Sequence, residues 1–118
     1  MRYIVVVQHR SEHAQPIHFA KGCFFIIGEK YEGPEDWDIW FFCRTPDSQE
    51  GWVPGQVVEQ LGPGRGKALE NYTALELNVN TGDVLIGTKK LNGWVWCHRP
   101  SETGSGWVPL KNLRGITQ

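Results

Sequence analysis

The chain has 118 residues, of which 40% are hydrophobic and 21% are charged, and its formal net charge at pH 7 is −1. This length fits one domain or two very small ones. A net charge near zero argues against general nucleic-acid binding, because such binding needs a basic surface that neutralises phosphates.

The N-terminal run Tyr3–Val7 is apolar but short, and it follows a single basic residue. It is too short for a secretory signal or for a membrane span. The three cysteines, Cys23, Cys43 and Cys97, are an odd set without a secretory signal, which is typical of reduced thiols in the cytosol. We therefore expect a cytoplasmic protein with no membrane partner.

Strands are predicted along most of the chain. The segments rich in β-branched and aromatic residues are, in chain order, YIVVV at 3–7, CFFIIG at 23–28, IWFFC at 39–43, VLIGT at 84–88 and WVWCH at 94–98. Gly, Pro, Asn and Asp bound these segments, as they bound strands. The segment 68–77 comes closest to a helical period, and we interpret its start as a strand.

The sequence also contains an internal repeat, which includes the tetrapeptide Gly-Trp-Val-Pro twice. Trp40–Leu61 aligns with Trp94–Gly115, and the tetrapeptides begin at Gly51 and Gly106. Such self-similarity indicates a repeated structural unit. We expect each tetrapeptide to close a small barrel, with its Gly permitting a turn, its Trp and Pro offering binding surface and its Val packing inward.

The prediction is an all-β fold made of two small five-stranded barrels in tandem. Residues 1–61 form the first barrel and residues 67–118 the second. The segment 62–66 is rich in Gly and Pro, a composition typical of a short linker. A barrel suits units of this size because closure leaves no exposed sheet edge.

Four ordered motifs in the second copy resemble the SH3 domain family. They are ALENY at 68–72, ELNVNTGD at 76–83, GWVWC at 93–97 and GWVP at 106–109. The family has an ALYDY box, an acidic loop, an ELxFxxGD stretch, a WW pair and a closing G-[YFW]-[IV]-P box. The resemblance covers residues 67–115 and extends more weakly to the first copy. It implies SH3-like barrels whose aromatic groove binds Pro-rich segments that are already extended.

The resemblance implies a ligand-binding groove in the second copy. Its residues are Tyr72, Trp94, Trp107 and Pro109, with Glu76 near the acidic position that pairs with a basic ligand residue. Two other positions depart from the family. Glu70 and Asn112 stand where the family has its first and last groove tyrosines, so we expect the pocket between them to be polar.

The first copy keeps less of the groove. It retains Trp40, Trp52 and Pro54, whereas Val7 and His9 stand at the two ALYDY tyrosines. An insertion at 31–39 adds four acidic residues and Trp37. If this copy binds a partner, the acidic, aromatic insertion is the expected contact.

Strand alternation places Trp94 and Trp96 on one face and the Cys97 side chain on the other. The resemblance implies that the Cys97 position points inward, so we expect Cys43 and Cys97 in the core. The position of Trp96, and of Phe42 in the first copy, is usually polar in the family. Either this face is covered by the other module or a second chain, or it is partly exposed.

The sequence predicts a non-catalytic module that binds an extended peptide, Pro-rich in the family, or a protein surface. Two alternatives are peptidoglycan binding by a bacterial SH3-type module and a structural subunit whose aromatic face is buried in an assembly. The spacing of His9, His13 and His18 does not converge on a metal, and Ala68 stands where a phosphate loop has Ser or Thr. With no nucleophile elbow, we expect no enzyme, cofactor or metal.

Overall fold

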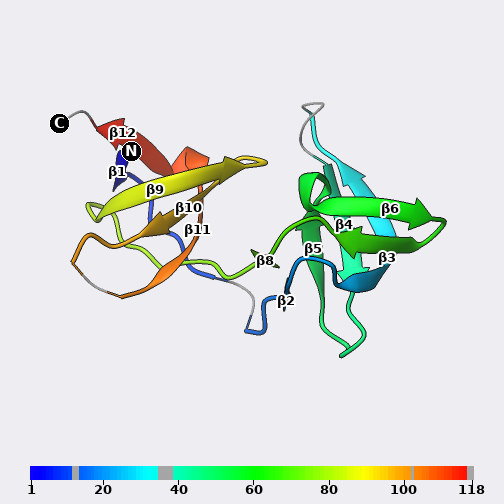
Figure 1. Cartoon of the computed structure of the whole chain (residues 1–118). Helices are drawn as coiled ribbons and strands as arrows, with labels where there is room; N and C mark the ends of the chain where they lie inside the picture. The colour runs from blue at the N-terminus through cyan, green and yellow to red at the C-terminus, as the bar shows by residue number, and fades with distance from the viewer. Residues whose placement is uncertain (12–13, 35–38, 102, 117–118) are drawn as a thin grey trace. The chain divides into compact units, whose positions relative to one another are not determined.

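The computed structural model describes residues 1–11, 14–34, 39–101 and 103–116. Its strands are β1 (Arg2–Val5), β2 (His18–Phe19), β3 (Phe24–Glu32), β4 (Ile39–Arg44), β5 (Glu50–Pro54), β6 (Val58–Gly62), β7 (Arg65–Ala68), β8 (Tyr72–Thr73), β9 (Val84–Leu91), β10 (Trp94–His98), β11 (Ser105–Pro109) and β12 (Leu113–Ile116) (Figure 1). Two single-turn 3-10 helices, η1 (Gly55–Val57) and η2 (Leu110–Asn112), follow β5 and β11. Within the described ranges no helix has the length and hydropathy that a bilayer crossing needs.

The strands form three antiparallel sheets. One has the order β11-β10-β9-β1-β12, a second has the order β5-β4-β3-β7-β6, and β2 pairs with β8 alone. The all-β prediction is therefore confirmed. In hydrogen-bond order neither five-stranded sheet closes on itself.

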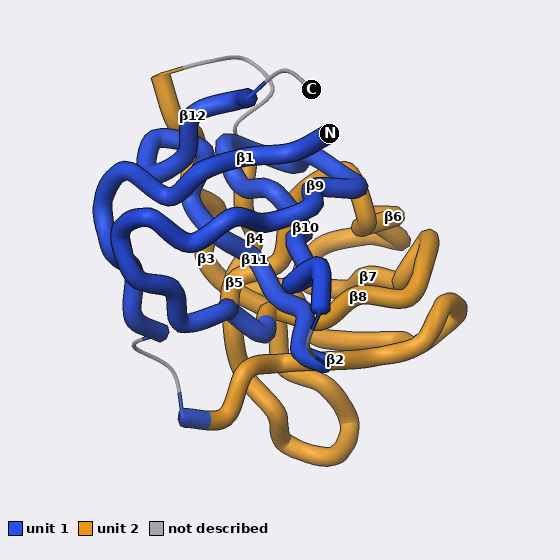
Figure 2. Tube along the Cα trace, turned by 90° about the vertical axis from the view of Figure 1, so that its left-hand side faces the viewer, with its two compact units in different colours: residues 1–14, 75–118 blue, residues 15–74 orange. Residues whose placement is uncertain are grey.

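The chain forms two compact units, one of which is discontinuous in sequence. Unit 1 comprises residues 1–14 and 75–118, and unit 2 comprises residues 15–74 (Figure 2). Unit 2 is therefore inserted between two parts of unit 1. This division replaces the boundaries expected at 1–61 and 67–118.

The reason for the different boundaries is an exchange of first strands between the two repeats. β1 belongs to the first repeat, yet it pairs with β9 and β12, so that Tyr3 lies opposite Leu85 and Gly115. β7 opens the second repeat, yet it pairs with β3 and β6, so that Lys67 lies opposite Phe24 and Glu59. Each first strand completes the sheet of the other repeat.

The segment expected as a linker is instead the turn of the β6–β7 hairpin. Two of its three glycines have positive φ angles, 146° at Gly62 and 71° at Gly64, which suit Gly because it has no Cβ. The Ile27 amide donates a 2.9 Å hydrogen bond to the Gly64 carbonyl. The Gly and Pro content of this segment therefore serves a tight turn.

Each unit has its own apolar core, built from the inward-facing side of its strands. In unit 1 the buried cluster is Tyr3, Val5, Val79, Leu85, Val95, Cys97, Val108 and Leu113. In unit 2 the buried apolar residues are Ile17, Phe19, Phe25, Phe41, Cys43, Val53, Val57, Val58 and Ala68. Burial raises the pKa of the Cys43 thiol to about 12 and that of Cys97 to about 11, as expected for core thiols.

Candidate functional site

The strongest candidate site in unit 1 surrounds Trp94, the first residue of β10. Trp94 lies directly opposite Pro109, the last residue of β11, and directly opposed residues of an antiparallel pair share a face. The Trp94 side chain is half-buried, whereas Pro109 is buried. We call this group, together with His9 and Glu76, the Trp94 site.

His9 supplies the second ring of the Trp94 site. Its imidazole meets the Trp94 indole edge-on, with ring centroids 5.7 Å apart and planes at 77°. Two backbone hydrogen bonds with Val79, each 3.0 Å long, fix the position of His9. The N-terminal segment thus places the His9 ring beside the Trp94 ring of β10.

Glu76 adds a partly buried carboxylate to the site. Its Oε1 lies 2.7 Å from His9 Nε2, and the two side chains are 12% and 15% exposed, respectively. The Trp107 amide donates to the Leu75 carbonyl at 2.9 Å, and the Leu77 amide donates to the Trp107 carbonyl at 3.1 Å. These bonds hold the backbone of Glu76 against β11, so its carboxylate is positioned by the sheet.

Trp107 pairs with the backbone of Glu76 and offers little open surface. Its side chain is only 7% exposed. It packs edge-on against Trp96, its register partner in β10, with centroids 5.3 Å apart. The sequence left two possibilities for this face, cover by the other module or a second chain and partial exposure. In the structure Trp107 of the same unit packs against Trp96, which is half-buried.

Unit 2 repeats this arrangement around Trp40. Trp40 lies opposite Pro54, and Phe42 lies opposite Trp52, with centroids of the latter pair 5.4 Å apart. Trp52 is 36% exposed, much more than its counterpart in unit 1. We call Trp40 and Pro54 the Trp40 site.

Four of the five residues expected in the second-copy groove belong to unit 1, and one does not. Tyr72 belongs to β8 of unit 2, where its ring packs 5.7 Å from that of Phe19. Because the first strands are exchanged, His9 and not Tyr72 accompanies Trp94 in unit 1. The alignment had placed His9 at an ALYDY tyrosine, but of the other copy, and strand patterns alone give no signal for the exchange.

The expected polar pocket of Glu70 and Asn112 is likewise divided between the two units. Asn112 is buried, and its side-chain amide donates to the Gln8 carbonyl at 3.2 Å. Its amide therefore ties the N-terminal segment to η2. Trp37 and His13 lie outside the described residues, and among those that the structure describes no three His, Cys, Asp or Glu side chains could hold a metal ion.

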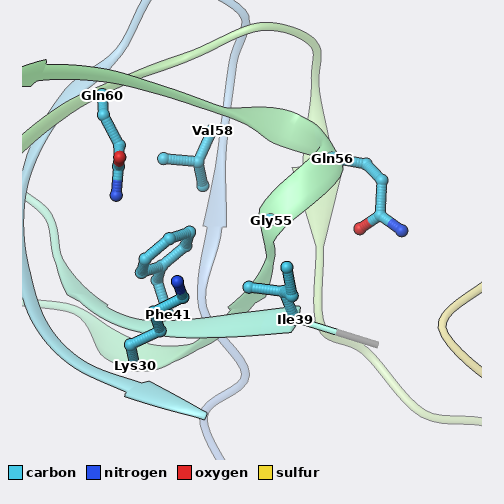
Figure 3. A pocket seen from close by; sticks show the side chains of 7 residues that line it. All are labelled: Lys30, Ile39, Phe41, Gly55, Gln56, Val58 and Gln60. Carbon is cyan, nitrogen blue, oxygen red and sulfur yellow. The ribbon is translucent and has the colours of Figure 1, made fainter. Parts of the chain in front are cut away.

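A hollow of ≈ 450 Å³ in unit 2 was not predicted from the sequence. Its lining residues are Lys30, Ile39, Phe41, Gly55, Gln56, Val58 and Gln60 (Figure 3). Lys30 and Gln60 point toward the Phe41 ring, whereas the Gln56 amide points away. The Lys30 ammonium also lies 2.7 Å from the Glu32 carboxylate. Neither residue of the Trp40 site lines this hollow, so it is a separate feature.

Comparison of the chain with protein-family models, with curated proteins and with solved structures finds no match. A functional conclusion must therefore come from the geometry of these sites.

Proposed function

We propose that the chain consists of two SH3-like modules with exchanged first strands, and that it binds extended peptide segments without catalysis. The Trp94 site is the main binding surface. The observation that carries this proposal is the His9 ring standing edge-on to the half-buried Trp94, which itself faces Pro109. Flat rings beside a proline form slots for an extended Pro-rich ligand, whose ordering costs little.

Two further observations support this proposal. The Trp40 site repeats the pairing of a half-buried Trp with a Pro at the end of the neighbouring strand. The ring of each Trp can contact an apolar ligand side chain. We also place the protein in the cytoplasm, in keeping with its three free thiols, Cys23, Cys43 and Cys97.

A second candidate is a structural subunit, favoured by a specific feature of unit 2. Phe24 and Ile26, alternate residues of β3, are 59% and 60% exposed. Large apolar side chains that neighbour one another on a sheet face often mark a surface that a partner covers. If the protein is such a subunit, the aromatic pairs only stabilise the sheets, and the partner binds the face of β3 that carries Phe24 and Ile26.

The test is an NMR titration of the indole N–H signals with a Pro-rich peptide library and, separately, with soluble peptidoglycan fragments. We expect Pro-rich peptides to shift the Trp94 signal, and Trp94→Ala to weaken binding about tenfold or more, as for a central interface Trp. Trp40→Ala is the matched control, because it removes the equivalent residue of unit 2. If no peptide shifts either signal, the proposal fails, and a response to peptidoglycan alone supports the cell-wall alternative.

A further inference from the structure

We propose that His9 determines the ligand class of the Trp94 site: by holding the Glu76 carboxylate, it removes the preference for a basic anchor that Glu76 would otherwise give the site. This inference rests on the proposed function and reverses one expectation from the sequence. The resemblance implied that Glu76 pairs with a basic residue of the ligand.

The carboxylate of Glu76 already has a hydrogen-bond partner inside the protein. His9 Nε2 lies 2.7 Å from Glu76 Oε1, and both side chains are more than four-fifths removed from solvent. A ligand guanidinium or ammonium would have to displace the imidazole or share the carboxylate with it. Either outcome cancels most of the gain that a charge-assisted hydrogen bond brings.

The imidazole cannot easily turn away from Glu76. The backbone of His9 forms two hydrogen bonds with Val79, and its ring packs edge-on against Trp94. Displacing the ring would remove an aromatic contact from the same wall that the ligand needs. The His9 imidazole therefore occupies the place beside Glu76 that a basic ligand residue would take.

The neighbouring cation acts in the same direction. Arg10 donates through Nη1 to the carbonyl of His9 at 3.0 Å and to that of Val79 at 2.7 Å. Its guanidinium is thus held beside the segment that carries His9. This positive charge opposes the approach of a cationic ligand residue, and the nearby Asp83 carboxylate, with which Arg10 interacts electrostatically, offsets part of it.

The test uses two matched Pro-rich peptides that differ only by Arg or Gln at the flanking position, with affinities measured by calorimetry. We expect the wild-type protein to bind both within about twofold. His9→Phe keeps a ring against Trp94 but removes the imidazole from Glu76, so this variant should prefer the Arg peptide about tenfold. Glu76→Gln in the His9→Phe background should abolish that preference. His18→Phe, an exposed histidine of unit 2, is the matched control and should keep the wild-type ratio.

A single substitution decides the matter if His9→Phe does not fold. Glu76→Gln in the wild-type background should change both affinities by the same factor, because Glu76 does not discriminate between the peptides. The inference is overturned if the wild-type protein prefers the Arg peptide about tenfold and Glu76→Gln removes that preference. It is also overturned if folded His9→Phe fails to discriminate. If neither peptide binds any variant, the proposed function itself fails and the inference with it.

Discussion

At the residue scale, the glycines that open the two repeated tetrapeptides are required by close packing and not by a turn. Gly51 and Gly106 lie inside β5 and β11, and neither has a positive φ. A Cβ on Gly106 would come within 2.6 Å of the Leu77 nitrogen, and one on Gly51 would come within 2.8 Å of Ile17 Cγ2. The first obstacle is backbone, whereas the second is the β-branched side chain of Ile17, whose Cβ would also lie within 3.1 Å.

This difference predicts unequal costs for the same substitution. Gly106→Ala should lower the free energy of unfolding of unit 1 by about 3 kcal/mol, because the backbone of Leu77 is hydrogen-bonded to Trp107 and cannot shift without breaking that bond. Gly51→Ala should cost unit 2 less, about 2 kcal/mol, because the buried, β-branched Ile17 side chain must shift but no backbone hydrogen bond has to break. Urea unfolding followed through amide signals of each unit measures both values. Equal losses of unfolding free energy would show that Gly51 and Gly106 are packed equally tightly.

The two valines of the tetrapeptides behave as the sequence predicted. Val53 and Val108 are 0% exposed, because strand alternation turns them inward when the preceding Trp faces outward. The tryptophans differ: Trp107 is nearly buried, whereas Trp52 remains more than one-third exposed. The same four residues therefore have different surroundings in the two units.

At the element scale, the β6–β7 hairpin is the feature that most changes the interpretation of the sequence. A flexible linker between 62 and 66 would tolerate any small residue, whereas a tight turn would not. Gly64 has a φ of 71°, in the left-handed region, and its carbonyl accepts the hydrogen bond from Ile27. A substitution at Gly64 should therefore destabilise the hairpin, whereas it would have no effect in a flexible linker.

Gly64→Ala should lower the free energy of unfolding of unit 2 by about 1–2 kcal/mol, the cost of placing a Cβ residue in this conformation. Pro63→Ala is the neighbouring control and should cost less than about 1 kcal/mol, because it mainly changes the entropy of the unfolded chain. Thermal unfolding monitored by unit 2 amide signals measures both changes. Two negligible effects would restore the linker interpretation.

The sequence predicts the strands of this protein better than their partners. The apolar runs at 23–28, 39–43, 84–88 and 94–98 lie largely within β3, β4, β9 and β10. Alternation also predicts that Cys97 and Trp96 face opposite sides of β10, and the resemblance implies that Cys97 faces the core. These properties are local, since a strand's own pattern of side chains determines them.

The pairing of the first strands is not local, and the sequence did not predict it. β1 and β7 both present alternating small or apolar side chains to a core, as Val5 and Ala68 show with 1% and 2% exposure. Either strand satisfies the alternation that either sheet requires, so periodicity cannot choose between them. The identity of the ring beside Trp94 depends on that choice, and therefore the His9–Glu76 pair could not be predicted.

At the scale of the whole molecule, the exchange makes one unit continuous in sequence and the other dependent on both ends of the chain. All strands of unit 2 lie within residues 15–74, including β7. Unit 1 needs β1, because this strand lies between β9 and β12 in its sheet. Arg2 pairs with Ile116, so the two ends of the chain run side by side.

These connections predict which fragments fold. A fragment of residues 15–74 should fold alone, because its sheet is complete, whereas residues 67–118 should not, because without β1 the edges of β9 and β12 are unpaired and the core residues Tyr3 and Val5 are missing. A permutant that joins 75–118 to 1–14 through a short Gly-Ser linker should restore a folded unit 1, since its new connection spans paired strand ends. Amide dispersion in NMR spectra and cooperative urea unfolding measure all three. A folded 67–118 fragment together with an unfolded 15–74 fragment would show that each repeat keeps its own first strand, and it would place Tyr72 beside Trp94 and leave Glu76 without the histidine that now restrains it.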